Sequence, residues 1–309
     1  MLEKKFTKIL HNRTIKDAKL LLFLIVLFGL FLRLIFFSGM GTSDSLAYSK
    51  AAYDIDRGID KDSVLTLTTR LGIVYATAFS YRLFGINEFS SVLFSLIVSI
   101  SSIILIFNFG KILFNKKIGL MAAFLLSFFP LDIVYSTQLL SDAPSAFFMA
   151  FGVYFFLYSE KKHKSAASAT IEIQKIQRLK FMAGYLFSGV FIGIGYLIRE
   201  SVLIIALFFI IYLLYNKKIR KEYFLIPLGI LLIFGIEALI FLELTGDPLF
   251  RTHISQRYLT ESVALDNYFG RLDFPTGLFH YPWLFLTNNL LSYFYIFIFI
   301  SVGYCLIYK

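Results

Sequence analysis

The chain has 309 residues, of which 58% are hydrophobic and only 16% charged, and its formal net charge is +10. This composition excludes a soluble domain, because the surface of such a domain needs more polar and charged residues than the chain supplies. The single cysteine, Cys305, excludes an intrachain disulfide and a cysteine-rich metal site.

Apolar runs of about 20 residues recur along the chain, each long enough to cross about 30 Å of hydrocarbon. We predict transmembrane helices at about 20–38, 89–113, 118–135, 143–158, 182–198, 201–215, 223–243 and 283–308. Pro130 interrupts the third of these runs. The sequence therefore predicts an all-α, polytopic transmembrane helical bundle of about eight spans that forms a single domain over residues 1–309.

Basic residues gather in four segments, which are separated from one another by an even number of predicted spans. These segments are 4–19, 116–117, 161–180 and 217–221. All four therefore face one side, which the positive-inside rule makes cytoplasmic, and both termini face the same way. This topology and anionic lipid headgroups account for the positive charge, so no nucleic-acid partner is needed. The loops 39–88 and 245–281 then lie on the outer face.

The first outer loop begins with a helix signal. Thr42 or Ser43 can cap the helix, and Asp44 falls in its first turn, where the helix dipole favours a negative charge. Tyr48 follows four residues later, so we expect it to share a face with Asp44. A carboxylate at this position can accept a proton from a bound hydroxyl group. The structural alternative is that Asp44 only begins a helix.

The rest of this loop is too apolar for a disordered segment. Residues 71–84 are apolar and aromatic and predict a helix lying in the membrane interface. Asp54-Ile-Asp56 and Asp60-Lys-Asp62 match a metal-binding pattern of soluble nucleotide-sugar transferases. Nothing else of that soluble fold is present, so we interpret both as solvated acidic turns and predict no metal site.

Three charged residues near the outer face have alternative interpretations. Arg33, late in the first span, either extends to the interface or reaches an outer acid such as Asp44. Asp142 either caps the fourth span or contributes a second carboxylate to a site with Asp44. Asp132 is a weaker candidate for the same role.

Later in the chain, Arg199 lies at the outer end of the fifth span. Its guanidinium group either reaches lipid headgroups or clamps phosphate oxygens. Glu237 lies inside the seventh span, where an acid is either functional or hydrogen-bonded in a structural role. The loop 245–281 brings Arg251 and Arg257 to the outer face.

Several short segments occur in an order and at a spacing that resemble a known family. They are Arg33, Asp44 with Tyr48 and Ala52, Arg70 ahead of residues 71–84, and segments 84–90, 114–123, 130–142, 189–199 and 245–248. Over about 250 residues, this order resembles the GT-C membrane glycosyltransferases. The similarity is to the protein O-mannosyltransferase-like group, which includes the lipid A aminoarabinose transferases.

The resemblance implies a module of seven spans whose first outer loop carries a catalytic aspartate. It implies a sugar donor linked to a polyprenyl phosphate and an acceptor that approaches from outside. Carried onto this sequence, Asp44 is the general base, Asp142 the second outer acid, and Arg70 and Arg199 the residues that meet the donor phosphate. Weaker contacts with donor or acceptor fall to Tyr48, Arg33, Arg257 and Glu237.

The chemistry of these residues agrees with the resemblance. An acceptor hydroxyl loses its proton as it attacks the anomeric carbon, and Asp44 can receive that proton. The leaving lipid phosphate is already charged, so it needs cationic side chains rather than protonation. A single displacement with inversion is therefore predicted. A lipid-linked donor also explains why no nucleotide-binding pattern is visible, and we expect no cofactor.

Two departures from the family pattern matter. Many relatives have an Asp-Glu pair at the first acidic position, whereas Ser45 follows Asp44 here, which favours a metal-independent reaction. Relatives are usually longer, so the chain is either a short or C-terminally truncated member or a fragment. We expect an outer active site at the plasma membrane and a protein, glycolipid or wall polymer as acceptor.

Two other function classes compete with this hypothesis. One is a transporter or lipid flippase, which often shows repeated halves and broken helices near the membrane midplane. No halves repeat here, and the polar candidates gather at the outer interface. The other is an inactive or structural membrane subunit.

Overall fold

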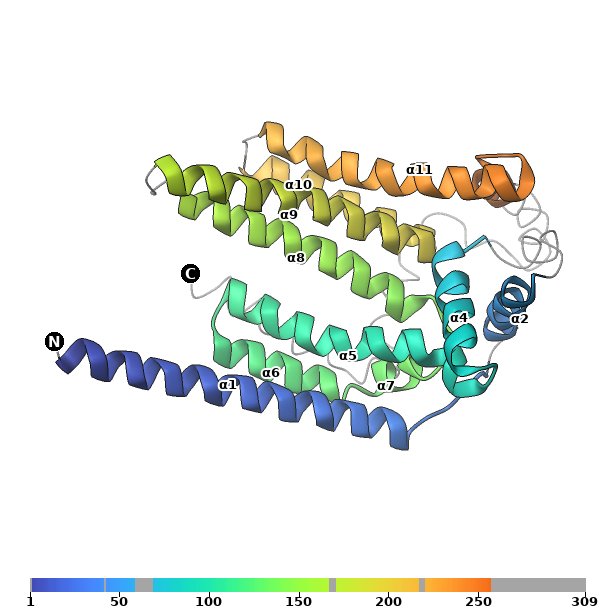
Figure 1. The fold of residues 1–309 in the computed structure, drawn as a ribbon. Coiled ribbons are helices and arrows are strands. Elements are labelled where there is room, and N and C mark those ends of the chain that lie inside the picture. The colour runs from blue at the N-terminus through green and yellow to red at the C-terminus, as the bar shows by residue number, and fades with distance from the viewer. Residues whose placement is uncertain (1, 42, 59–68, 167–170, 217–219, 257–309) are drawn as a thin grey trace, which may run out of the picture. The chain divides into compact units, whose positions relative to one another are not determined.

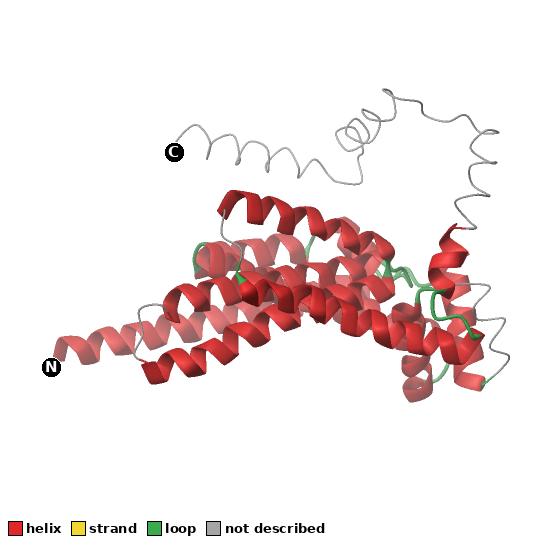
Figure 2. Ribbon diagram, turned by 90° about the horizontal axis from the view of Figure 1, so that it is seen from above, coloured by secondary structure: helices red, strands yellow, loops and turns green. Residues whose placement is uncertain are grey.

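The computed structural model describes residues 2–41, 43–58, 69–166, 171–216 and 220–256. Within these ranges the chain is helical with connecting loops and contains no strand (Figure 2). The chain divides into two compact units, Met1–Pro248 and Leu249–Lys309. In the second unit, residues 250–256 are helical. The predicted all-α fold is confirmed.

The first unit combines long helices with short helical segments. In chain order they are α1 (Leu2–Ile35), α2 (Ser43–Arg57), α4 (Leu71–Phe84), α5 (Glu88–Leu113), α6 (Lys116–Ser127), α7 (Pro130–Ser136), α8 (Asp142–Ala166), α9 (Ile171–Ile198), the 3-10 helix η1 (Glu200–Ile205), α10 (Ala206–Asn216), the 3-10 helix η2 (Lys221–Phe224) and α11 (Leu225–Thr245).

The long helices of this unit run along a common direction, whereas α2 and α4 lie across one end of them (Figure 1). Helix α5 packs against α1, α4, α6 and α8, and α9 packs against α8, α11 and the start of η1. Helix α4 matches the predicted interfacial helix at residues 71–84. Its transverse placement is what a helix in the membrane interface requires.

Four predicted spans coincide with helices that are long and apolar enough to cross a membrane. These helices cover Asp17–Ile35, Glu88–Leu113, Arg178–Ile198 and Lys221–Thr245. A fifth predicted span, at 118–135, is the pair α6 and α7, which is bent by 62°. The bend falls at Pro130, where α7 begins, because proline cannot continue a helix but fits its first turn.

The remaining predicted spans differ from these five. The span at 143–158 lies within α8, which at 25 residues is about 38 Å long. This helix is not among the described helices that are apolar enough to be candidate membrane spans, and its apolar residues are largely phenylalanine and tyrosine. The span at 201–215 is the short apolar helix Glu200–Asn216. The span at 283–308 lies outside the described residues.

A buried carboxylate joins four helices at the basic end of the bundle. Glu160 of α8 accepts hydrogen bonds from Tyr185 (2.6 Å), Tyr212 (2.8 Å), Tyr223 (2.9 Å) and Arg220 (3.1 Å). Burial by itself raises the pKa of this carboxyl group. The hydrogen bonds from the tyrosines and the charge of Arg220 outweigh that effect, so the pKa of Glu160 lies below its ordinary value. Glu160 is therefore a charged anchor between α8, α9, α10 and η2.

Glycines allow α9 and α11 to approach each other closely. A Cβ atom on Gly229 would lie 2.5 Å from the carbonyl oxygen of Leu186, and one on Gly189 would meet the carbonyl oxygen of Ile226. Small residues at such contacts allow helix backbones to pack directly in a membrane. The close packing of these two spans therefore requires glycine, which has no side chain, at both positions.

Alanine at Gly229 and at Gly235 of α11 should have opposite effects. Gly229→Ala forces the two backbones apart and should cost about 1–3 kcal/mol of stability. Gly235 has no atom near the position of a Cβ, so Gly235→Ala should be neutral or should stabilise the helix by up to about 1 kcal/mol. Thermal unfolding midpoints of both variants in one detergent measure the difference. Equal midpoints would contradict the packing argument.

Candidate active site

Helix α2 begins at Ser43, and Asp44 lies in its first turn as predicted. The face formed by Tyr48, Ala51 and Ala52 is buried and packs against α4 in a core cluster. Asp44 lies one turn before Tyr48 on the same side of α2, but its own side chain is exposed. No hydrogen bond or ion pair joins Asp44 to another residue of the described ranges, so its carboxylate keeps its acceptor capacity.

Polar side chains from α2, α4, α8 and η1 meet at the end of the bundle where α2 and α4 lie. We call them the outer cluster, which consists of Tyr48, Arg70, Ser141, Asp142, Arg199 and Glu200. Arg70 donates to the hydroxyl of Tyr48 and to Oγ of Ser141 (3.1 Å). Its Nε lies 3.8 Å from a carboxylate oxygen of Glu200. Arg199 forms an ion pair with Asp142.

Local packing explains why these residues meet. Arg70 immediately precedes α4, and Gly72 at the start of that helix is so close to the end of α9 that a Cβ would lie 2.6 Å from Ile198 Cγ1. The start of α4 is therefore held beside residues 199–200. Ser45 of α2 donates to the carbonyl oxygen of Leu139 (3.1 Å), which holds α2 against the loop that leads into α8.

A pocket of about 330 Å³ lies beside the ion pair of the outer cluster. Its lining is Asp142, Ser145, Ala146, Met149, Arg199, Ser201, Val202 and Ile204. The side chain of Arg199 is 33% exposed and that of Asp142 is 45% exposed, so a ligand can reach both. The structure thus brings Asp142 and Arg199 to one pocket. Asp44 and Arg70 do not line it.

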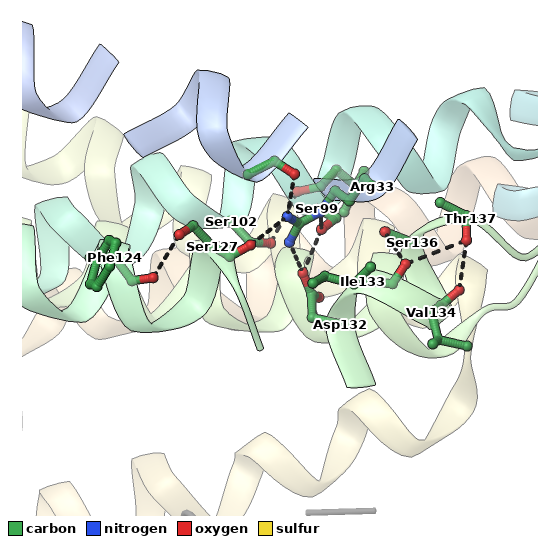
Figure 3. A network of polar contacts seen from close by, with 12 residues as sticks. Arg33, Ser99, Ser102, Phe124, Ser127, Asp132, Ile133, Val134, Ser136 and Thr137 are labelled. Atoms are coloured by element: carbon green, nitrogen blue, oxygen red, sulfur yellow. Dashed lines mark hydrogen bonds and ion pairs between the residues drawn. The ribbon is translucent and has the colours of Figure 1, made fainter. Parts of the chain in front are cut away.

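A second polar network lies within the bundle and is centred on Arg33 (Figure 3). The Arg33 side chain is fully buried and donates from Nε to Ser99 Oγ (2.8 Å). Its Nη1 donates to the carbonyl oxygens of Gly29 (2.8 Å) and Ser127 (3.0 Å). Its Nη2 forms an ion pair with Asp132, which also accepts a hydrogen bond from Ser99 (2.5 Å).

This network decides between the two interpretations of Arg33. Its side chain does not extend to the interface but pairs with an acid, which is Asp132 rather than Asp44, because the bend at Pro130 places Asp132 beside α1. A charge inside a membrane bundle is tolerated when it is paired and hydrogen-bonded. Arg33, which we predicted as a weak contact with donor or acceptor, joins α1, α5, α6 and α7. Asp132, a weak candidate for the site, is its partner.

The structure does not show the predicted donor or acceptor contacts of α11 and the loop after it in the outer cluster. Glu237 is buried within α11, and Arg257 lies outside the described residues. Arg251 is buried and belongs to the second unit. Residues 245–248 end α11: Gly246 adopts a left-handed conformation (φ 76°), which glycine allows without strain.

Two groups of residues were not predicted for the site. Ser141 accepts a hydrogen bond from Arg70, and Ser99 accepts one from Arg33. A serine within an apolar sequence carries no local signal of such a role. Glu200 directly follows Arg199 in the sequence, so its position next to a predicted site residue could have identified it. Among the described residues no group of three metal-ligating side chains occurs.

Similarity to a known family extends over more than half of the chain. A family model described as dolichyl-phosphate-mannose-protein mannosyltransferase matches residues 71–241. The matched segment runs from the first residue of α4 into α11 and includes Asp142 and Arg199. No curated protein and no solved structure matches the chain.

The ion pair between Arg33 and Asp132 should be a strong contributor to stability that depends on both partners. Arg33→Met or Asp132→Leu leaves the other buried group unpaired and should cost up to about 3–5 kcal/mol. The double variant should lose less than the sum of the two single losses. Thermal unfolding of the four proteins in one detergent gives the comparison.

The control for that series is Lys19→Met, which removes an exposed charge from the same helix as Arg33. It should change stability by less than about 0.5 kcal/mol. Strictly additive losses from Arg33→Met and Asp132→Leu would show that the two side chains do not act as a pair.

Proposed function

This chain belongs to the dolichyl-phosphate-mannose-protein mannosyltransferase family, and we propose that it transfers a sugar from a polyprenyl phosphate to a hydroxyl acceptor. Membership makes the chain a membrane glycosyltransferase of the GT-C type, similar to mannosyltransferases. It favours this function over a transporter or flippase. The proposal adds an inverting reaction on the outer face, with Asp44 as its general base.

The observation that carries the proposal is the pair of partly exposed guanidinium groups in the outer cluster. Arg70 and Arg199 both contact acids of the cluster, and Arg199 also lines the pocket of about 330 Å³. That pocket combines charged groups with apolar side chains such as Met149 and Ile204. A lipid phosphate has the same two parts, a charged head and an apolar chain.

Arg199 can bind a phosphate without leaving Asp142. A guanidinium group has five N–H donors, and the ion pair uses Nη1 of Arg199. The remaining donors suit the oxygens of a phosphate, for which the planar guanidinium is well shaped. Asp142 therefore acts as a positioning residue that orients Arg199. In this role Asp142 does not itself accept the proton of the acceptor hydroxyl.

Asp44 suits the role of the base because no side chain of the described ranges occupies its carboxylate. In the proposed step, the acceptor oxygen bonds to the anomeric carbon while the bond from that carbon to the phosphate oxygen breaks. The phosphate leaves with the bonding electron pair, and the hydroxyl proton passes to Asp44. Arg199 and Arg70 stabilise the charge that gathers on the leaving phosphate. One displacement of this kind inverts the anomeric centre.

Mass analysis of glycans and glycolipids from cells with and without the protein tests the function directly. We expect one mannosylated or otherwise glycosylated product to be missing without the protein. An acceptor identified in this way then serves in a transfer assay with membranes and labelled polyprenyl-phosphate mannose. Identical glycan and glycolipid profiles would contradict the proposed function.

Asp44→Asn should slow transfer strongly without affecting the fold. The amide cannot accept the acceptor proton, so the rate should fall by about 10²–10⁴-fold, the usual contribution of a general base. Asp56→Asn, at the other end of α2, is the matched control and should retain the rate of the wild type. The initial rate of transfer at equal protein level is the measurement. A wild-type rate in Asp44→Asn would exclude Asp44 as the base.

Arg199→Gln should weaken donor binding. Losing hydrogen bonds to a charged phosphate costs about 1.5–3 kcal/mol, which corresponds to a rise in donor KM of about tenfold to a hundredfold. Arg199→Lys keeps the charge and should recover part of the loss. Arg82→Gln, an exposed arginine of α4 outside the outer cluster, should leave the KM unchanged. An unchanged donor KM in Arg199→Gln would remove Arg199 from the donor site.

A further inference from the structure

A second polar pocket lies at the opposite end of the long helices, where α5 ends and the last turns of α8 pass it. Its volume is about 280 Å³. Three lysines line it, Lys111 of α5 and Lys161 and Lys162 of α8, together with the rings of Tyr154 and Tyr158. The two rings stack with centroids 6.3 Å apart and form one wall.

The charges of this lysine pocket are not balanced within it. Its described lining contains no aspartate or glutamate. The nearest acid in the sequence, Glu160, is committed to Arg220 and three tyrosines in its own buried cluster. Three ammonium groups around one small volume repel each other, and an anion bound among them would relieve that repulsion.

Two of the lysines have partners of their own, which do not neutralise them. Lys161 donates to the carbonyl oxygen of Ile112 (3.2 Å), in the last turn of α5, and Lys162 lies 5.5 Å from the ring centre of Tyr158. These contacts hold both ammonium groups against Ile112 and Tyr158, which also line the pocket. A general excess of cytoplasmic lysines explains the positive charge of this end, but it does not explain a pocket with an aromatic wall.

We propose that the lysine pocket binds the phosphate headgroup of an anionic phospholipid. The pocket lies at the basic end of α5 and α8, which the charge distribution predicts to face the cytoplasm, where anionic lipids attract basic groups. Its volume is just below the range of about 300–1,000 Å³ that is typical of small-molecule sites, so it fits a headgroup without its acyl chains. This inference is independent of the proposed transferase activity.

The lining matches such a headgroup in its chemistry. The lysine ammonium groups and the tyrosine hydroxyls donate hydrogen bonds to phosphate oxygens. The tyrosine rings and Ile112 offer apolar surface to the glycerol carbons next to the phosphate. Tyrosines are also favoured at the depth of lipid headgroups. The lysine pocket therefore has donors and apolar contacts arranged for one amphipathic ligand.

Native mass spectrometry of the full chain in detergent, titrated with phosphatidylglycerol or phosphatidylcholine, tests the proposal. We expect the wild type to bind phosphatidylglycerol in preference. Each lysine near a membrane surface contributes about 1 kcal/mol, so replacing one by glutamine should weaken binding about fivefold. The triple variant Lys111→Gln/Lys161→Gln/Lys162→Gln should lose the preference. The corresponding triple change to arginine should keep it.

The matched control replaces three basic residues of the same end that do not line the pocket. It is Lys116→Gln/Lys117→Gln/Lys164→Gln, and it should retain the lipid preference. Equal losses in both glutamine triples would show a diffuse surface effect and overturn the proposal. Displacement of the lipid by millimolar inorganic phosphate would also overturn it, in favour of a site for a soluble anion.

Discussion

The ion pair between Arg33 and Asp132 is the constraint on which the rest of the first unit depends. Arg33 is fully buried in an apolar bundle, so the free energy of placing its charge there is acceptable only with a paired carboxylate and satisfied N–H groups. Ser99 and the carbonyl oxygens of Gly29 and Ser127 accept three further hydrogen bonds from the guanidinium group. One side chain thus fixes α1, α5, α6 and α7 relative to each other.

The position of α7 determines the position of the outer cluster. Ser38 and Thr137 are hydrogen-bonded (2.9 Å), which joins the chain after α1 to the end of α7. The loop that follows α7 then presents Leu139 to α2 and Ser141 to Arg70. Arg33 therefore influences the position of the candidate site through packing, by way of α7 and the loop that follows it.

The sequence was sufficient to predict the all-α fold and five of the eight spans, and insufficient to predict most contacts between the helices. Hydropathy locates the spans because apolar runs have few alternatives in a membrane, and Pro130 marks the bend because of its missing N–H. Arg33 and Asp132 are 99 positions apart, and no local pattern relates them. The exposure of Asp44 depends on how α2 packs on α4, which the period of one helix leaves open.

The family match begins at Leu71, so the proposed base and Arg70 precede the matched segment. Contacts within the first unit nevertheless attach α2 to that segment. Ser49 is hydrogen-bonded to Tyr81 of α4 (2.7 Å), and Ser45 is hydrogen-bonded to the backbone at Leu139. Tyr48, one turn after Asp44, meets Arg70, which in turn contacts Ser141. Helix α2 is thus held by α4 and by the loop that leads into α8, so the proposed base and the arginines of the outer cluster lie at the same end of the bundle (Figure 1).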